Sequence, residues 1–275
     1  MLDLRQTPEY AKYMTYIGWV VEKKGNTYYY IKKIPLLGSV LKIQRPLNIS
    51  YQYINVLVVK YRVFQVIIEP KNTNQISRIT YYGYKQSKSP SLPSKTIHID
   101  LTKSGKQMLK EMHYKTRYNI KLGKRSKVKV KNSKDIERFT QFWQDCALKQ
   151  RGMFLPMKKE IKSIYNIFNK NTDLIFVLHS NELIAGILLL HSNNISYYMY
   201  AASNADGKKL YAPTICAWEA IKLARKRGSK IFDFEGIYDE RFPLKSWKGF
   251  TRFKKSFGGH EVEYPGAFVK FRFPI

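Results

Sequence analysis

Acidic side chains are scarce in this sequence. Its 275 residues include 20 Asp and Glu against 49 Lys and Arg, which gives a formal net charge of +29 at pH 7. A charge excess of this size makes a chain repel itself, so it is costly unless it attracts a partner of opposite sign. The shortage of acids therefore favours an anionic partner, and the candidates are RNA, DNA, anionic lipid and a phosphorylated substrate.

Cysteine and histidine are also rare. The two cysteines, Cys146 and Cys216, fall in segments with amphipathic helical patterns, where cysteine acts as a small buried apolar residue. This argues against a disulfide or a metal site and fits a reducing compartment. The five histidines are scattered along the chain, and no nucleophilic triad is apparent. His179 and His191 lie at expected strand ends beside polar turns, so we expect them to be structural.

Long apolar runs are missing as well. The longest, Leu183–Leu190, is far short of the roughly 20 residues that a membrane-spanning helix needs. The opening residues MLDLRQ lead into no apolar segment of the kind found in signal peptides. We therefore expect a cytoplasmic protein, either free in solution or peripheral at the inner face of the cell membrane in contact with its anionic surface.

Apolar and aromatic side chains, in contrast, are plentiful. Hydrophobic residues make up 44% of the chain and aromatic residues 15%, with 21 tyrosines. This content can fill a core, so the chain is not a disordered basic tail. A length of 275 residues allows one large domain or two small ones.

Residues 1–100 have the pattern of a first α/β lobe. Gly18 ends the first helical pattern, and Glu69-Pro70 closes a fully apolar strand. The expected elements are a helix at Pro8–Gly18 and strands at Trp19–Glu22, Thr27–Ile31, Val40–Ile43, Gln65–Ile68 and Ile97–Leu101.

The segment that follows is the most basic part of the chain. Between Thr102 and Lys131 there are 11 Lys and Arg residues and one acid, Glu111. A rough helical spacing of apolar residues from Met108 to Leu122 leads us to treat residues 101–127 as a basic hinge helix between two lobes. Such a helix suits a phosphate-bearing partner, because arginine offers a forked donor and clustered lysines add a field that salt screens.

Residues 128–275 form a second α/β lobe with a clearer pattern. The expected elements are helices beginning near Ile136 and Met157, strands at Leu174–His179, Leu183–His191 and Ile195–Ala201, a helix at Pro213–Gly228, a strand at Ile231–Phe234, a basic helix at Trp247–Phe257 and a final strand. This order is that of the N-acetyltransferase (GNAT) fold. Acyl-CoA enzymes of that fold hold the pyrophosphate in a glycine-rich loop, but the corresponding segment AASNADGKKLYAP has a single glycine, Gly207.

The basic helix near the C-terminus combines aromatic and basic residues. Three phenylalanines recur at the spacing of one helix face, and two glycines end the helix. By itself this pattern predicts only an apolar stripe turned to the core and a solvated basic face. The residues are Phe250, Phe253, Phe257, Gly258 and Gly259.

Several of these segments resemble motifs of the FemABX family of non-ribosomal peptidyltransferases. FKKSFGG followed by VEYPG is similar to the family's FK..FGG…v.y.G motif, and YKTRYNIKLGK resembles its hinge motif. Arg45-Pro46, DFEGI and IIEP are further matches, although the family usually has Asp where Glu69 stands. The resemblance covers nearly the whole chain, most strongly residues 97–266, and it implies an α/β protein of two fused GNAT-like lobes, the first one reduced.

The resemblance also implies an activity. It is that of an aminoacyltransferase that uses no cofactor, takes aminoacyl-tRNA as co-substrate and adds amino acids to the amine of a UDP- or lipid-linked muramyl peptide. An aminoacyl ester is already activated, so an amine can attack it once both are positioned, and the developing oxyanion then needs a fixed positive donor. Lys254, the lysine of the FK pair, is the candidate catalytic residue. The sequence leaves open whether Lys254 or Lys255 faces the site.

Further site residues follow from the same resemblance. Tyr198 and Tyr200 match the family's Y.Y strand and are expected on one side of it, facing the acceptor. Lys158 or Lys159 would stand in for a family arginine, Glu69 would also contact substrate, and Asp233 would orient a neighbour or cap a turn. The residues expected to bind tRNA or its phosphates are Lys115, Arg117, Lys121, Lys124, Arg125, Lys208, Lys209, Arg252 and Lys255.

Two other functions fit parts of the sequence. The first is a GNAT-like acyl-CoA N-acyltransferase acting on a polysaccharide or lipid-linked substrate, against which the missing glycine-rich loop argues. The second is a non-enzymatic adaptor that binds nucleic acid or a membrane surface. It explains the net charge of +29 but not the match of Lys254, Gly258 and Gly259 to a catalytic lobe.

Overall fold

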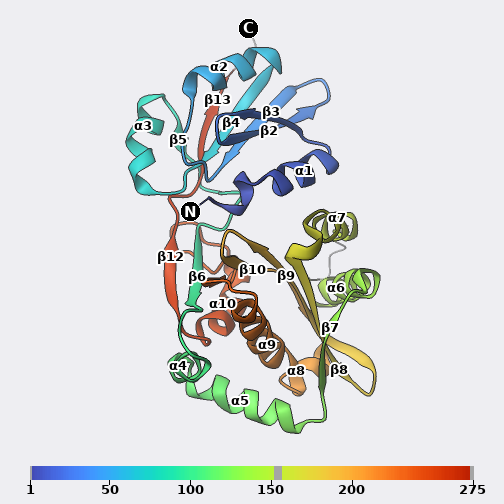
Figure 1. Ribbon diagram of the computed structural model, residues 1–275. Helices are drawn as coiled ribbons and strands as arrows, with labels where there is room; N and C mark the ends of the chain where they lie inside the picture. The colour runs from blue at the N-terminus through green and yellow to red at the C-terminus, as the bar shows by residue number, and fades with distance from the viewer. Residues whose placement is uncertain (1, 152–156, 273–275) are drawn as a thin grey trace. The chain divides into compact units, whose positions relative to one another are not determined.

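The computed structural model describes residues 2–151 and 157–272 (Figure 1). Within these residues the chain forms two compact units, each built around one sheet. The first comprises residues 2–95, 238–245 and 263–272, and the second comprises residues 96–151, 157–237 and 246–262. The chain therefore crosses between the units more than once, whereas the sequence suggested consecutive lobes at residues 1–100 and 128–275.

The sheet of the first unit has the strand order β1-β2-β3-β4-β13-β5. Neighbouring strands from β1 to β3 are antiparallel, β3 and β4 are parallel, and β13 is antiparallel to both of its neighbours. The strands are β1 (Val20–Lys24), β2 (Thr27–Ile34), β3 (Gly38–Gln44), β4 (Val63–Glu69), β5 (Lys85–Gln86) and β13 (Phe268–Phe271). The four strands predicted up to residue 69 are confirmed.

Three α-helices accompany this sheet: α1 (Pro8–Tyr16), α2 (Tyr51–Lys60) and α3 (Ile76–Tyr81). The predicted helix α1 is present and begins at a Thr7 cap. The sequence did not predict α2 or α3. In α2, Tyr51, Ile54 and Leu57 form a buried face in the core of the unit. Its β-branched and aromatic residues favour a strand as readily as a helix, so only packing against the sheet decides between them.

The sheet of the second unit has the order β12-β6-β11-β10-β9-β8-β7. Its strands are β6 (Lys95–Asp100), β7 (Lys129–Ser133), β8 (Thr172–His179), β9 (Glu182–Ser192), β10 (Ile195–Ser203), β11 (Ile231–Asp233) and β12 (His260–Glu263). The three antiparallel strands β8, β9 and β10 and the parallel strand β11 are confirmed.

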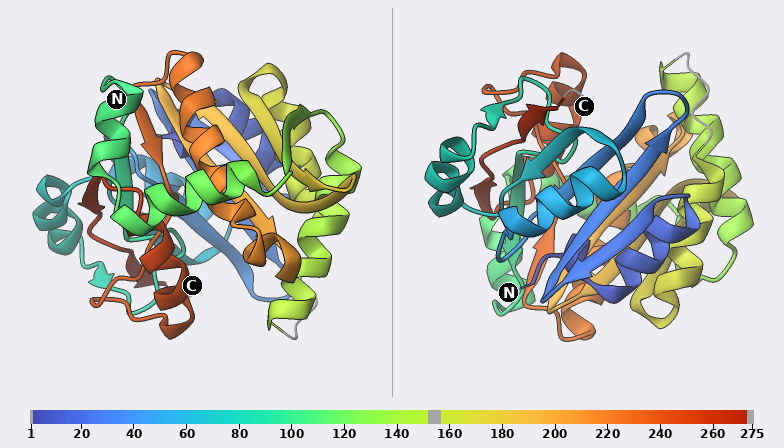
Figure 2. Two further views of the ribbon diagram at one scale, coloured as in Figure 1. Left: turned by 90° about the horizontal axis from the view of Figure 1, so that it is seen from below. Right: turned by 90° about the horizontal axis from the view of Figure 1, so that it is seen from above.

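Helices cover both faces of the second sheet. Helices α6 (Ile136–Arg151) and α7 (Lys158–Phe168) lie on one face, and α9 (Ala212–Lys226) lies on the other, with α5 (Tyr114–Arg125) packed on it (Figures 1 and 2). The shorter helices are α4 (Gly105–Glu111), α8 (Ala205–Lys209) and α10 (Lys248–Lys255). Cys146 on α6 and Cys216 on α9 are buried and unbonded, which confirms that they are small core residues.

The predicted hinge helix at residues 101–127 is two helices, α4 and α5. The backbone is extended at Met112 (φ −68°, ψ 151°), and His113 then caps α5 by accepting a hydrogen bond at Nδ1 from the Lys115 amide. Both helices belong to the second unit.

The two units share one topology. Each has three antiparallel strands, a helix, a fourth strand parallel to the third and a fifth strand antiparallel to the fourth: β1-β2-β3, α2, β4 and β13 in the first unit, and β8-β9-β10, α9, β11 and β6 in the second. This confirms the fold of two GNAT-like lobes, although no internal repeat is visible in the sequence.

In both units the fifth strand comes from a distant part of the chain. Phe268 of β13 pairs with Ile68 of β4, and Phe232 of β11 pairs with Ile99 of β6. The final strand expected after Gly259 is β12, which lies at the edge of the sheet of the second unit, so that expectation is confirmed. The sequence did not predict β13, which extends the sheet of the first unit.

Candidate functional site

Lys254 lies inside the second unit. Its side chain is buried, with 8% of its surface exposed, and its Nζ atom donates hydrogen bonds to the carbonyl oxygens of Phe234 (2.6 Å) and Gly236 (2.7 Å). Lys255 is exposed and pairs with Glu261. The structure therefore decides the alternative that the sequence left open: Lys254 is the lysine that points inward.

Apolar residues of α10 and of the segment just after it hold Lys254 in this position. Phe257, which follows the helix, is buried, Phe253 of α10 packs against the same core, and their rings are 5.2 Å apart. The Lys254 ammonium lies 4.8 Å from the centre of the Phe250 ring and 5.7 Å from that of Tyr198. Two of its three N–H groups have carbonyl acceptors, and the third has no hydrogen-bond acceptor among the described residues.

Burial sets the charge state of Lys254. Loss of hydration lowers the pKa of its ammonium to about 8, although the carboxylates of Glu235 and Asp233 act in the opposite direction. Lys254 is therefore largely protonated at neutral pH but loses its proton within a range that is accessible to the folded protein.

The turn that receives Lys254 has an unusual backbone. Glu235 has a positive φ of 52° and Gly236 a φ of 106°. A left-handed conformation is costly for a residue with a side chain, and such positions are found at functional sites where surrounding contacts hold them. Here those contacts are the two hydrogen bonds from Lys254 and one from the Glu235 amide to Asp233 Oδ1, at 2.8 Å.

Asp233 is the centre of a small buried polar cluster. Its Oδ1 accepts a hydrogen bond from the Thr96 hydroxyl (2.6 Å), and its Oδ2 lies 3.2 Å from His98 Nε2. Burial opposes ionisation, but the hydrogen bonds from His98, Thr96 and the Glu235 amide, together with the His98 charge, hold the pKa of Asp233 below its usual value. Asp233 therefore does both things foreseen for it: it orients its neighbours and caps the turn.

The sequence did not identify Thr96 and His98 as part of this cluster. Both lie on β6, where they alternate with the buried residues Ile97 and Ile99. That alternation places Thr96 and His98 on one face of the strand. It was the only signal available, and it does not reveal that β11 pairs with β6 and brings Asp233 opposite His98.

The prediction that Tyr198 and Tyr200 share one side of their strand is wrong. A β-bulge between them shifts the register, so that Tyr198 pairs with Leu189 of β9 and Tyr200 pairs with Leu188. Successive residues of β9 point to opposite faces, and paired residues share a face, so the two tyrosines do not. Tyr198 faces Phe234 and Lys254, whereas the ring of Tyr200 lies 6.0 Å from that of Trp143 on α6.

Lys158 and Lys159 lie at the start of α7, which covers the same face of the sheet on which Tyr200 lies. Lys158 donates a hydrogen bond to the Gln141 side chain of α6, and Lys159 is exposed. The structure therefore brings Tyr198 together with Lys254 and places Tyr200, Lys158 and Lys159 with the opposite helical layer.

Glu69 belongs to the first unit, where it is buried rather than facing solvent. Its carboxylate accepts hydrogen bonds from the amides of Ser91 (2.9 Å) and Leu92 (2.7 Å) and from the Ser91 hydroxyl (2.9 Å). Gln44 donates a further one at 3.3 Å. Protein donors thus surround this carboxylate, and it fixes the loop at residues 91–92.

The basic residues of α5 fall into an exposed group and one residue, Arg117, that makes structural contacts. Lys115, Lys121, Lys124 and Arg125 are exposed. Arg117 is half-buried, and its Nη1 donates to carbonyl oxygens at the end of α4, among them Lys110 at 3.2 Å and Met112. Arg117 therefore joins α4 to α5, and the other four remain as a basic surface.

Helix α5 is fixed to α9 by close contact. A Cβ atom at Gly123 would lie 2.2 Å from Cδ1 of Ile215, so the two helices approach too closely there for a larger residue. Thr116 and Ile120 are buried on the same face of α5. The basic surface is thus carried by a helix with a fixed orientation in the second unit.

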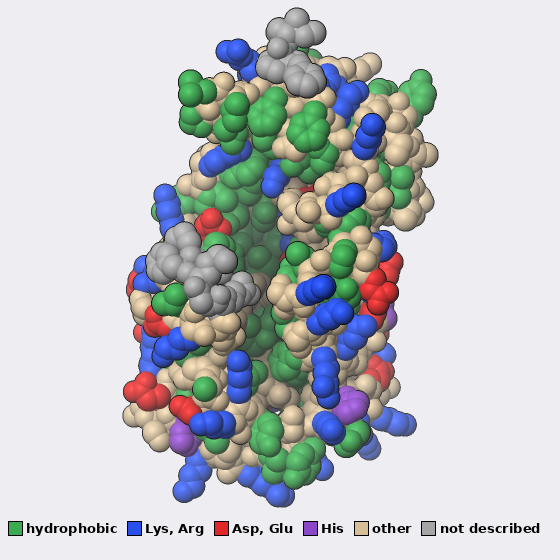
Figure 3. Space-filling model, turned by 180° about the vertical axis from the view of Figure 1, so that it is seen from behind, with side chains coloured by type: hydrophobic (Ala, Val, Ile, Leu, Met, Phe, Trp, Pro, Cys, Tyr) green, Lys and Arg blue, Asp and Glu red, His purple; other side chains and the backbone are tan. Residues whose placement is uncertain are grey.

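The other residues expected to bind tRNA are also exposed. Lys208 and Lys209 lie on α8, Lys209 pairs with Asp206 at 3.3 Å, and Arg252 lies on α10. Gly207 packs closely, because a Cβ atom there would lie 2.2 Å from the Ile184 carbonyl oxygen. Figure 3 shows Lys and Arg side chains spread over the visible face of the molecule, with fewer Asp and Glu.

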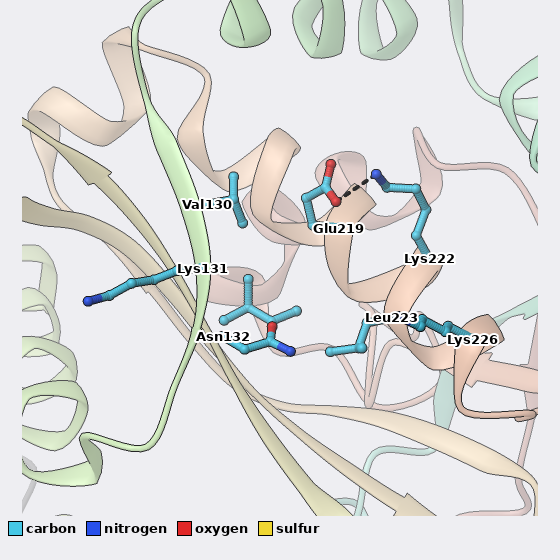
Figure 4. Close-up of a pocket in the computed structure, with 8 residues that line it drawn as sticks. Val130, Lys131, Asn132, Glu219, Lys222, Leu223 and Lys226 are labelled. Atoms are coloured by element: carbon cyan, nitrogen blue, oxygen red, sulfur yellow. Dashed lines mark ion pairs between the residues drawn. The ribbon is translucent and has the colours of Figure 1, made fainter.

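A pocket of about 310 Å³ opens between β7 and α9. Figure 4 shows the Glu219–Lys222 ion pair at one side and Lys131 pointing away from it. Its lining residues are Val130, Lys131, Asn132, Ile175, Glu219, Lys222, Leu223 and Lys226. None of the residues that the sequence predicted for the site lines this pocket.

Comparisons with known proteins agree with this architecture. Residues 147–274 match the model of the FemAB family. The lipid II:glycine glycyltransferase of Staphylococcus haemolyticus strain JCSC1435 is 30% identical over 97 residues, which is 35% of this chain and 23% of that protein. The match therefore spans less than a quarter of the relative's length.

Two solved structures share the fold. The crystal structure of FemX has a TM-score of 0.80 at 17% identity, over 98% of this chain and 92% of that one. A tandem GNAT protein from the clavulanic acid biosynthesis pathway has a TM-score of 0.54 at 7% identity, over 92% and 82% of the two chains. None of the described helices is long and apolar enough to cross a membrane. Residues 147–274 are thus similar to the FemAB family, and the fold of the chain is that of FemX.

Proposed function

We propose that the protein is an aminoacyltransferase that adds amino acids to the stem peptide of a peptidoglycan precursor. The observation that carries this proposal is Lys254, a buried cation held by two backbone carbonyls in the lobe that matches the FemAB model. The lipid II:glycine glycyltransferase relative supports the same reaction class and a lipid-linked acceptor.

The donor in this proposal is aminoacyl-tRNA, used without a further cofactor. The neutral amine of the muramyl peptide attacks the ester carbon, a C–N bond forms and a tetrahedral oxyanion develops. The C–O bond to the tRNA ribose then breaks, and the proton lost by the amine is taken up by the departing ribose oxygen. The ester is already activated, so positioning of the two substrates supplies much of the rate enhancement.

Lys254 stabilises the oxyanion in this reaction. Its ammonium has one N–H group that no described acceptor takes, and the low-dielectric surroundings strengthen its interaction with a developing negative charge. The Phe234–Gly236 turn orients it, and Tyr198 lies close enough to contact the same reacting groups. The exposed basic residues of α5, with Lys208, Lys209, Arg252 and Lys255, contact the tRNA phosphates.

A transfer assay tests this proposal. Purified protein is mixed with radiolabelled aminoacyl-tRNAs and a UDP- or lipid-linked muramyl pentapeptide, and the label on the muramyl peptide is measured. We expect transfer that RNase treatment of the donor abolishes, and assays of single tRNAs identify the amino acid. Equal transfer from acyl-CoA in an RNA-free mixture would contradict the proposed donor.

A further inference from the structure

Two tyrosines on α5 are exposed without a structural reason. Tyr114 and Tyr118 have 62% and 59% of their surface accessible, although large aromatic side chains are normally buried for much of their area. Tyr114 contacts its own end of the helix, where its ring lies 4.6 Å from the His113 ring and 5.9 Å from the Lys115 ammonium. Neither ring is part of the core of the second unit.

These tyrosines form one stripe with basic residues. Tyr114, Tyr118, Lys121 and Arg125 follow one another at intervals of four, three and four residues, which places them on one face of a helix. All four are exposed. Helix α5 contains no acidic residue.

The opposite face of α5 is closed. Thr116, Ile120 and Gly123 are buried, and the close Gly123–Ile215 contact prevents the helix from rotating about its axis. The stripe is therefore presented to solvent in a fixed direction. Aromatic rings next to cations on a rigid surface are the arrangement that binds single-stranded nucleic acid, because bases stack on the rings and the cations contact the backbone.

We infer that the Tyr114–Tyr118 stripe binds an unpaired stretch of RNA. In this arrangement the two rings stack on nucleobases, and Lys121 and Arg125 contact the neighbouring phosphates. The inference rests on the proposed function, in which the donor is an aminoacyl-tRNA, and it names the part of that donor which this surface recognises: unstacked nucleotides rather than the duplex.

A membrane surface fits the stripe less well. A helix that lies on a bilayer inserts a broad apolar face among the lipids. The apolar face of α5 is buried against α9, and the exposed stripe offers only two hydroxyl-bearing rings. Anionic vesicles therefore serve as the competing ligand in the test.

The test measures binding of the full-length protein to uncharged tRNA and to a single-stranded oligoribonucleotide at several salt concentrations. We expect the double variant Tyr114→Ala, Tyr118→Ala to lose about tenfold or more in affinity for both, with an unchanged dependence on salt, because stacking releases no counterions. The Tyr114→Phe, Tyr118→Phe variant should keep the wild-type affinity. The Lys121→Gln, Arg125→Gln variant should bind RNA more weakly. The slope of log affinity against log salt concentration should also fall by the amount that corresponds to about two lost phosphate contacts.

Tyr81→Ala is the matched control, since Tyr81 is 84% exposed on α3 of the first unit and should have no effect. The inference would be overturned if the double alanine variant bound RNA with wild-type affinity. It would also be overturned if this variant lost binding only to phosphatidylglycerol vesicles. The stripe and the proposed function can fail separately. If the double alanine variant binds RNA like wild type and still carries out tRNA-dependent transfer, only the inference about the stripe is refuted. If wild type transfers nothing from any aminoacyl-tRNA but its RNA binding still depends on the two tyrosines, only the proposed function is refuted.

Discussion

The Nζ atom of Lys254 lies 2.6 Å from the carbonyl oxygen of Phe234. A second hydrogen bond, to Gly236, ties the same ammonium to the other end of a turn whose middle residue, Glu235, has a left-handed backbone. One side chain therefore holds the turn and carries the buried charge that the proposed reaction requires. Substitutions at Lys254 are expected to affect both properties, and the measurements below separate them.

Replacement of Lys254 by methionine should reduce transfer by about 100-fold or more, the loss typical of one oxyanion donor. Methionine has a similar length and suits the surrounding Phe250 and Tyr198 rings, so the core should remain filled. The rate constant of transfer and the midpoint of urea unfolding would be measured for each variant. Lys230→Met, at an exposed position, is the control and should match wild type in both. A folded Lys254→Met protein with full activity would exclude Lys254 from catalysis.

The low pKa of Lys254 predicts opposite effects of pH on rate and stability. Transfer needs the protonated ammonium, so the rate should fall above pH about 8 as this group loses its proton. The folded-state pKa lies below the ordinary value of 10.5, so between these two values the unfolded chain binds the extra proton. Stability should then rise with pH across that window.

Urea unfolding from pH 7 to 10.5 checks this sign, because Lys254→Met should remove the rise that this group contributes. Identical pH profiles of stability for the variant and the wild type would show that Lys254 keeps an ordinary pKa.

The Asp233 cluster should stabilise the fold at neutral pH. The pKa of Asp233 is depressed in the folded state, so its contribution is complete above the unfolded value of 3.8 and is lost as pH falls through the folded-state pKa. Asp233→Asn should cost about 2 kcal/mol at pH 7, since it weakens hydrogen bonds to an ionised acceptor.

Denaturant unfolding at pH 7 and in acid would measure this contribution, which should be smaller in acid. Asp206→Asn on α8 is the matched control, because its exposed pair with Lys209 should contribute almost nothing. If Asp233→Asn lowered the free energy of unfolding as little as Asp206→Asn does, the buried cluster would contribute nothing to stability.

The approach of α5 to α9 depends on Gly123. Gly123→Val places a Cβ and two methyl groups where Ile215 Cδ1 lies 2.2 Å away, so the helices must separate. We expect destabilisation by about 2 kcal/mol, the usual cost of overpacking. Thermal unfolding measures it, with Gly105→Ala as the control, because a Cβ at Gly105 meets nothing within 4 Å. If the Gly123→Val protein unfolded at the same temperature as wild type, α5 would not be held against α9.

Much of the fold could be predicted from local pattern. The cap at Thr7, the polar turns between β8, β9 and β10, and the spacing of Phe253 and Phe257 each act over a few residues. For that reason α1, the antiparallel strands of the second unit and α10 were predicted correctly. The segments that became α2 and α3 were not predicted, because their residues suit strand and helix alike until a sheet covers one face.

The chemical identity of the candidate site was also visible in the sequence, but its geometry was not. The FK pair pointed to Lys254, and the motif around DFEGI pointed to Asp233. The strand alternation of Tyr198 and Tyr200 gave a wrong expectation, because a single bulged residue reverses the face of everything beyond it. Nothing in the sequence forecasts that bulge.

The sequence by itself determined the charge, most strands of both lobes and the residue types that carry the proposed chemistry, since these depend on neighbours along the chain. Tertiary structure alone decided that Lys254 rather than Lys255 is buried, that His98 meets Asp233 and that β13 joins the first sheet. The reason is physical. Lys254 is held by carbonyl groups 18 and 20 positions away, and the His98–Asp233 contact joins residues 135 positions apart. No local periodicity encodes which of these distant segments will meet.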